Sequence, residues 1–160
     1  SETDALTGVF NRRYFQERLD LAIAQAGRRE VGLALLMFDI DHFKQINDQF
    51  GHATGDRVLQ VCCQRLGARL RHSDLLCRLG GEEFAVLCSQ TNLAQAAALA
   101  EMLRALLADE AIGDAGRVTA SFGVAEWRAG ETADDLLSRA DAALYTAKRA
   151  GRDRVRLAPC

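Results

Sequence analysis

The sequence lacks a long apolar run, a secretory signal and an excess of basic residues. No stretch approaches the roughly 20 apolar residues that span a bilayer, and the chain opens on polar residues instead of a signal peptide. Its 20 Lys and Arg residues are balanced by 22 Asp and Glu residues, so we expect no binding of nucleic-acid polymers. Binding of single nucleotides is still compatible with this charge, since a metal ion can supply the positive charge. We place the chain in the cytoplasm, with no direct insertion into a membrane.

Paired cysteine spacing is also absent. The five cysteines are odd in number, most lie inside apolar patterns, and none shows the spacing of a zinc site; they are Cys62, Cys63, Cys77, Cys88 and Cys160. Buried, reduced thiols are the simplest interpretation.

Internal repeats and low-complexity linkers are missing as well. With 160 residues, 49% of them hydrophobic, the chain fits one compact domain. Its abrupt start at Ser1 leads us to expect that residues 1–160 form a single catalytic or binding domain of a longer, regulated protein.

Helical and strand periodicities alternate along the chain, which predicts an α/β sheet protein. Residues 31–38 form an apolar run typical of a central strand covered on both faces. Asp41 is expected to cap a short helix, while Asn92 with Gln95 resembles a capping box. The expected helices cover residues 11–26, 41–46, 53–70, 92–108 and 132–150, and the expected strands cover residues 31–38, 75–79, 84–88, 117–125 and 154–157.

The segment from Gly80 to Phe84, Gly-Gly-Glu-Glu-Phe, is the most informative feature that is present. A Gly-Gly pair between two apolar runs predicts a hairpin, with a type I′ turn that needs positive φ at both central positions. The hairpin then places Glu82 and Glu83 at the rim of a sheet. Exposed acidic residues beside turns are common, so the segment alone also fits a surface without function.

Asp39, directly after the apolar run 31–38, gives these glutamates a partner. Open α/β sheets bind ligands at the carboxyl ends of parallel strands. If the hairpin packs beside this strand, Asp39 and Glu82 converge, and two carboxylates with phosphate oxygens and water suit Mg²⁺. The alternative is that Asp39 merely caps the following turn.

In its ordered motifs the chain resembles the diguanylate cyclase family, the GGDEF or GGEEF domains. The resemblance covers nearly the whole chain, and the matching segments are Asp4 to Gly8, Asn11 to Arg13, Phe38 to Lys44, Asn47-Asp48, Gly51-His52, Gly55-Asp56, Gly80 to Phe84, Ser121 to Val124, Ala140-Asp141, Tyr145, Lys148 and Gly151-Arg152. Val9 and Asp153 depart from the usual Leu and Asn, and we expect Asp153 to perturb a turn.

The resemblance implies condensation of two GTP molecules into cyclic di-GMP, with release of two pyrophosphates. It also implies a central, mostly antiparallel sheet flanked by helices, like that of class III nucleotide cyclases and polymerase palm domains. Asp39, Glu82 and the backbone carbonyl of Ile40 would bind one or two Mg²⁺ ions, with Mn²⁺ as an alternative.

Further roles follow from the same resemblance. Glu82, Glu83 and Lys44 are the catalytic candidates. Glu82 would assist proton removal or act as a metal ligand only. Glu83 would contribute a second carboxylate to the metal or form a salt bridge to Lys44, and we favour the salt bridge.

The resemblance also assigns residues to GTP. Asn47 and Asp56 would read guanine, because the Asp56 carboxylate can accept from guanine N1 and N2, and His52 is a further GTP-binding candidate. The alternative is that Asn47 and Asp56 only cap the turns around Gly51 and Gly55. Lys44, Lys148 and Arg152 would bind the phosphates. As an alternative, Lys148 and Arg152 are basic residues at a solvated helix end, where the helix dipole favours them.

Arg71 and Asp74 resemble the family's product-binding inhibitory motif, with five residues between Asp74 and Gly80. Arg71 would pair with phosphate or guanine, and Asp74 would accept from guanine. A helix-end ion pair is the alternative. Arg104 on the following helix is a candidate for support of this site.

Because the product has two-fold symmetry, catalysis should need two copies of the domain that face each other in a homodimer. Two other classes compete with this interpretation: a non-catalytic nucleotide receptor that uses Arg71 and Asp74, and an adenylyl cyclase or polymerase palm with the same metal chemistry.

Overall fold

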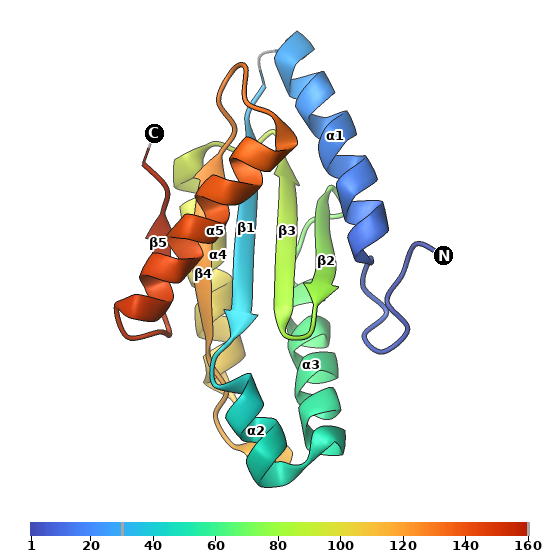
Figure 1. The fold of residues 1–160 in the computed structure, drawn as a ribbon, viewed down its shortest axis with the longest axis vertical. Helices are drawn as coiled ribbons and strands as arrows, with labels where there is room; N and C mark the ends of the chain where they lie inside the picture. Colours follow the sequence, from blue (N-terminus) through green and yellow to red (C-terminus); the bar gives the residue numbers. More distant parts are fainter. Residues whose placement is uncertain (30, 160) are drawn as a thin grey trace.

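The computed structural model describes residues 1–29 and 31–159, so Cys160 lies outside the described residues. A five-stranded sheet lies between two layers of helices (Figure 1). The helices are α1 (Arg12–Arg29), α2 (Phe43–Phe50), α3 (His52–Gly67), α4 (Leu93–Asp109) and α5 (Ala133–Arg149), and the strands are β1 (Leu33–Ile40), β2 (Asp74–Gly80), β3 (Glu83–Ser89), β4 (Ala120–Glu126) and β5 (Val155–Leu157).

The strands lie in the order β2-β3-β1-β4-β5. All neighbours are antiparallel except β4 and β5. One core cluster joins the sheet to α3 and α4, and a second joins the opposite face to α1 and α5. The predicted fold class, a mostly antiparallel sheet flanked by helices, is confirmed.

Strand β1 is the centre of the molecule, and all eight of its residues are buried. Phe38 stacks on Phe84 of β3 and on Phe122 of β4, with ring centroids 5.2 and 4.7 Å apart. These three residues are directly opposite one another in the two ladders. Aromatic cross-strand pairs of this kind fix the register of neighbouring strands.

Three details of the expected strands are wrong: the end of β1, its direction relative to its neighbours, and the type of the hairpin turn. β1 continues to Ile40, so Asp39 lies inside the strand, and β1 is antiparallel to both neighbours. In the β2–β3 hairpin the pairing of Gly80 with Glu83 leaves Gly81 and Glu82 as the turn, with a register shift between Arg78 and Gly80. Of these residues only Gly81 has a positive φ, at 21°, so the type I′ prediction is wrong.

Local signals at the helix starts are confirmed at α4 and α5. Asn92 and Thr132 are the N-caps of these helices, and each forms a capping box with the residue three positions later. The expected helix after Asp41 also forms, but its N-cap is His42, in the left-handed region at φ 56° and without a side-chain cap. Asp41 therefore does not cap α2, and its contacts lie elsewhere.

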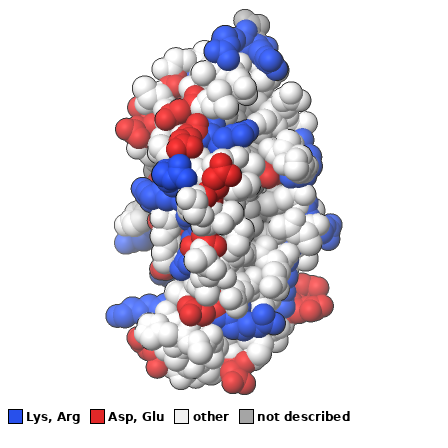
Figure 2. Space-filling model, turned by 90° about the vertical axis from the view of Figure 1, so that its right-hand side faces the viewer, with Lys and Arg blue, Asp and Glu red and all other residues white. Residues whose placement is uncertain are grey.

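The cysteines within the described residues are buried and free, namely Cys62, Cys63, Cys77 and Cys88. Burial raises the pKa of each thiol to about 12, which keeps these thiols protonated at neutral pH. No helix of residues 1–29 and 31–159 is long and apolar enough to cross a membrane. On the face shown in Figure 2, basic and acidic residues are interspersed, in keeping with the net charge of −2.

Close packing of α5 on β4 depends on Gly123. A Cβ atom there would lie 2.2 Å from the backbone nitrogen of Leu144 and 2.3 Å from the carbonyl oxygen of Ala140. Backbone atoms of a packed helix cannot move aside without shifting the helix. Gly123 thus sets how closely α5, with Lys148 near its end, approaches the sheet.

We expect Gly123→Ala to lower the free energy of unfolding by about 1–3 kcal/mol, as overpacked cores do. Urea denaturation measures the effect. The matched control is Gly67→Ala at the end of α3, where a Cβ would meet nothing within 4 Å; it should leave stability unchanged or raise it by up to ~1 kcal/mol. Equal stabilities for the two variants would contradict close packing at Gly123.

Candidate active site

A cleft of about 510 Å³ lies where four segments meet: the end of β1, the start of α2, the hairpin turn and the end of α5. In Figure 1 these segments lie towards the lower end of the sheet. The cleft is lined by Asp39, Ile40, Asp41, His42, Phe43, Lys44, Gln45, Asp48, Glu82, Lys148 and Arg152. Six predicted metal or phosphate residues, Asp39, Ile40, Lys44, Glu82, Lys148 and Arg152, are therefore brought together.

Strand pairing explains why Asp39 and the hairpin converge. Asp39 is opposite Glu83 in the β1–β3 ladder, and the Ile40 N–H donates to the Glu82 carbonyl oxygen at 3.3 Å. Side chains alternate along a strand. Asp39 consequently projects on the same side of the sheet as Met37, the side covered by α5.

Asp39 is only 7% exposed, and its two oxygens have different surroundings. Oδ2 accepts a hydrogen bond from Lys148 Nζ. Oδ1 is buried and has no hydrogen-bond partner among the described residues. Burial raises the pKa of Asp39 and Glu82 adds to the effect, while Lys148 opposes it. Oδ1 is thus an acceptor that the described residues leave unused.

The donor set fits a hard divalent ion. Within residues 1–29 and 31–159, no group of three or more His, Cys, Asp or Glu side chains is arranged as a metal site. The predicted donors, the carboxylates of Asp39 and Glu82 and the carbonyl of Ile40, are all among the residues that line this cleft. Mg²⁺ prefers oxygen ligands and keeps several positions for water and substrate phosphates, which matches a small protein donor set.

Glu83 is half-buried beside this centre. Burial raises its pKa, and the nearby charges of Asp39 and Asp141 add to the effect. The cations that oppose the rise are Arg12 and Lys148. No ion pair of the described residues joins Glu83 to Lys44, so the favoured salt bridge is not present and Glu83 does not line the cleft.

The other three residues predicted to bind GTP lie outside the cleft lining. Asn47 is on α2, while His52 and Asp56 are on α3. A Cβ on Gly55 would lie 1.8 Å from Asn47 Oδ1, so the glycine allows the Asn47 side chain to lie against α3 at the residue that precedes Asp56. The structure brings Asn47 and Asp56 to one junction, and their roles stay predictions.

Five of the residues that line the cleft were given no metal, catalytic or substrate role from the sequence, namely Asp41, His42, Phe43, Gln45 and Asp48. Asp41 is the most constrained of them. It is 5% exposed and accepts hydrogen bonds from the Ser121 hydroxyl at 2.6 Å and the Thr119 hydroxyl at 2.7 Å. The available signal was a second carboxylate two residues after Asp39, at the end of a buried strand.

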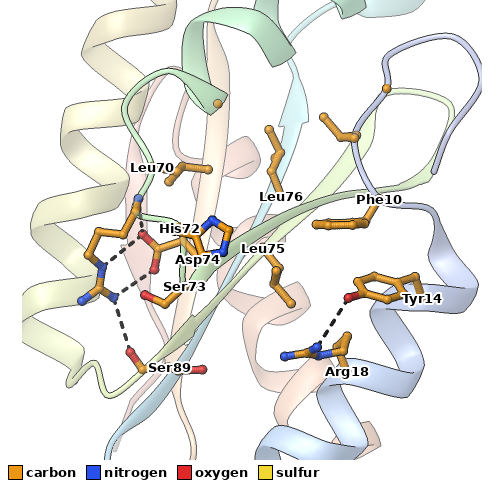
Figure 3. Close-up of a pocket in the computed structure, with 14 residues that line it drawn as sticks. Phe10, Tyr14, Arg18, Leu70, His72, Ser73, Asp74, Leu75, Leu76 and Ser89 are labelled. Carbon is orange, nitrogen blue, oxygen red and sulfur yellow. Dashed lines mark hydrogen bonds and ion pairs between the residues drawn. The ribbon is translucent and has the colours of Figure 1, made fainter. Parts of the chain in front are cut away.

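A second cleft, of about 830 Å³, lies between α1 and the start of β2. Figure 3 shows His72 and Asp74 on one side of it, with Phe10, Tyr14 and Arg18 on the other. The rings of Phe10 and Tyr14 stack, with centroids 4.4 Å apart.

Arg71 and Asp74 of this second cleft form an ion pair. Arg71 donates to the two Asp74 oxygens at 2.9 and 3.2 Å, and also to the Thr91 hydroxyl at 3.0 Å. The Asp74 side chain is 1% exposed, whereas that of Arg71 is 57% exposed. Asp74 therefore orients Arg71, and the exposed guanidinium is the group that faces solvent.

The expected support from Arg104 does not occur at this cleft. Arg104 pairs with Glu101 at 2.6 Å and with Asp153 at 2.7 Å, and it is not among the residues that line the second cleft. Its partner Asp153 follows Arg152 of the first cleft. The guanidinium is therefore part of the surroundings of the first cleft.

Comparison with known families gives one match over almost the whole chain. The family model described as "Diguanylate cyclase, GGDEF domain" matches residues 1–154. Among curated proteins, "Diguanylate cyclase DgcP" of Pseudomonas aeruginosa is 45% identical over 159 residues, covering 98% of this chain and 24% of that protein. "Response regulator PleD" of Caulobacter vibrioides is 43% identical, covering 96% of this chain and 35% of that protein. The chain thus spans about a quarter to a third of these two relatives.

Solved structures give the same result for the fold. The GGDEF domain of DgcB from Caulobacter crescentus, solved in complex with c-di-GMP, has a TM-score of 0.95 at 37% identity, covering 99% of this chain and 94% of that one. The active GGEEF domain of a diguanylate cyclase from Vibrio cholerae has a TM-score of 0.89 at 34% identity, covering 94% of this chain and 97% of that one.

Proposed function

The chain belongs to the family of diguanylate cyclase GGDEF domains, and on that premise we propose that it condenses two GTP molecules into cyclic di-GMP with release of two pyrophosphates. One observation carries the proposal beyond family membership. The cleft at the end of β1 combines two carboxylates, Asp39 and Glu82, with the cations Lys44, Lys148 and Arg152. Such a combination suits a metal-bound triphosphate.

Asp39, Glu82 and the Ile40 carbonyl would hold one or two Mg²⁺ ions, with Mn²⁺ as the alternative. The unpartnered Asp39 Oδ1 supports this assignment. When bound, the metal neutralises triphosphate charge and lowers the pKa of the attacking 3′-hydroxyl. Glu82 lies on the hairpin turn at the cleft, where it can also accept the hydroxyl proton.

The cations bind and orient the phosphates. Lys44 is on the first turn of α2, and Lys148 and Arg152 come from the end of α5 and the turn after it. They approach the cleft from two sides, which holds the α-phosphate in place for attack. Glu83 is half-buried next to Asp39, and its charge helps to retain the cations around the site.

Guanine is selected at the α2–α3 junction. Asp56 would accept hydrogen bonds from guanine N1 and N2, a donor pair that adenine does not offer. Asn47 and His52 would contact the same nucleoside. The placement of the Asn47 side chain against Gly55, next to Asp56, supports a shared subsite.

One cleft holds one GTP, so the reaction requires two copies of the domain facing each other in a homodimer. Each copy presents a 3′-hydroxyl to the α-phosphate held by the other. We assign the reaction to the cytoplasm and this domain to a longer protein, whose other parts would raise the local concentration of the two copies.

Incubation with GTP and Mg²⁺, followed by chromatography, tests the reaction. We expect cyclic di-GMP and pyrophosphate from the domain when it is fused to a dimerising coiled coil. Glu82→Ala should lower the rate by about 100-fold or more, because loss of even an outer-shell metal contact costs about 10–100-fold. The control is Glu110→Ala, at an exposed position after α4, which should retain the rate. Absence of product from the enforced dimer would overturn the proposal.

We also propose that the product inhibits the enzyme at the second cleft. Arg71, fixed by Asp74 and Thr91 but 57% exposed in its side chain, would bind a product phosphate or guanine. A related GGDEF domain has been solved with c-di-GMP bound, which supports product binding by this fold.

Arg71→Ala should raise the concentration of cyclic di-GMP needed for half-inhibition at least about tenfold, since charge-assisted hydrogen bonds are lost. Initial turnover should stay largely intact. Progress curves with added product measure both quantities. Arg69→Ala, which removes a neighbouring exposed arginine whose guanidinium donates to the Met102 sulfur, is the control. Unchanged inhibition in the Arg71 variant would contradict this assignment.

A further inference from the structure

The turn after α5 has an unusual backbone. Gly151, Arg152 and Asp153 all have positive φ, at 124°, 64° and 45°. For a residue with a side chain the left-handed region is disfavoured and persists when surrounding contacts enforce it. Two such residues in succession need contacts that hold them.

Arg152 depends on this backbone for its position. Its side chain lines the active-site cleft. Within the part of the chain that the structure describes, its guanidinium makes no hydrogen bond or ion pair, whereas its backbone N–H donates to the Ala147 carbonyl at 3.1 Å. The conformation of the turn therefore decides where the guanidinium can reach.

Asp41 holds the turn from the other side of the cleft. Its Oδ2 atom accepts from the Asp153 N–H at 3.0 Å and from the Thr119 hydroxyl at 2.7 Å, and its Oδ1 atom accepts from the Ser121 hydroxyl at 2.6 Å. Both oxygens are occupied by donors from this chain. Asp41 is thus committed to protein contacts, in contrast to Asp39 with its unpartnered oxygen.

A second contact reaches the same residue from α4. The Asp153 carboxylate accepts from Arg104 at 2.7 Å, and Arg104 is in turn held by Glu101. Asp153 is therefore fixed at its main chain by Asp41 and at its side chain by Arg104. Asp153 stands where we expect Asn from the family resemblance. The replacement has a physical consequence here, because an ionised carboxylate pairs more strongly with a guanidinium than an amide does.

We propose that Asp41 is a positioning residue that orients Arg152 for the triphosphate of GTP, an inference that rests on the proposed function. Asp41 follows the metal-ligand candidate Asp39 by two residues at the end of β1. Its hydrogen bond to Asp153 joins that strand end to the turn that carries Arg152. This hydrogen bond thereby fixes the position of the Arg152 guanidinium relative to Asp39 at the end of β1.

A purely structural role is the competing explanation, because a buried carboxylate with three donors stabilises any fold. The two explanations differ in their coupling to Arg152. If Asp41 acts through Arg152, its loss has no further effect on GTP binding once Arg152 has been removed. If it acts only through stability, folded Asp41→Ala binds GTP as tightly as the wild type, and if it affects binding independently of Arg152, the two losses multiply.

Calorimetric titration with the magnesium complex of α,β-methylene-GTP, a non-reactive analogue, tests the coupling. We expect Asp41→Ala and Arg152→Ala each to weaken binding about tenfold, and the double variant to bind no more weakly than Arg152→Ala. Asp41→Asn should stay within about threefold of wild type, because its amide oxygen can accept from the Asp153 N–H and its NH₂ can donate to the Ser121 hydroxyl. Thr132→Ala, which removes the N-cap at the far end of α5, should lower the thermal midpoint without changing affinity.

If folded Asp41→Ala binds the analogue with wild-type affinity, or if the affinity losses of the single variants multiply in the double variant, this inference is overturned while the proposed function stands. Failure of the wild-type protein both to bind the analogue and to form cyclic di-GMP would overturn the proposed function and this inference with it. If Asp41→Ala does not fold, Asp41→Glu replaces it in the same cycle. That variant keeps the charge but displaces the carboxylate by one methylene, and the same coupling is expected.

Discussion

β1 and β3 pair so that Asp39 lies opposite Glu83 and the Ile40 N–H reaches the Glu82 carbonyl. This register is fixed in the core, where Phe38 stacks between Phe84 and Phe122. A slip of one residue would turn every side chain of a strand to the other face. The stacking of the three phenylalanines would then be lost, and Asp39 would no longer lie beside the hairpin turn that carries Glu82. Apolar packing thus determines the geometry of a polar site.

The site itself carries unfavourable features that the rest of the fold stabilises. The pKa of Asp39 is raised by burial, and that of Glu83 is raised in the same way. Arg152 and Asp153 adopt left-handed conformations. Such features concentrate at functional sites, where geometry matters more than local stability. Here Lys148 partly offsets the acidic charge, and Asp41 and Arg104 hold the turn.

Local patterns were sufficient to predict the central strand, the hairpin, the capping box at Asn92 and the start of the last helix at Thr132. Each of these features depends on residues close together in the sequence. The extension of β1 through Asp39 was not predictable from the apolar run, because an acidic residue ends that pattern while the ladder with β3 and β4 continues. The role of Asp41 was missed for a similar reason, since its donors Thr119, Ser121 and Asp153 come from distant segments.

We propose that the strand register brings Asp39 and Glu82 together as a metal-binding pair. A crystal structure of the domain with Mn²⁺ and α,β-methylene-GTP tests it most directly, because the anomalous signal locates the metal independently of the surrounding protein. Mn²⁺ is expected within about 2.5 Å of carboxylate oxygens from both Asp39 and Glu82. A metal held by the triphosphate alone, with either carboxylate out of reach, would contradict it.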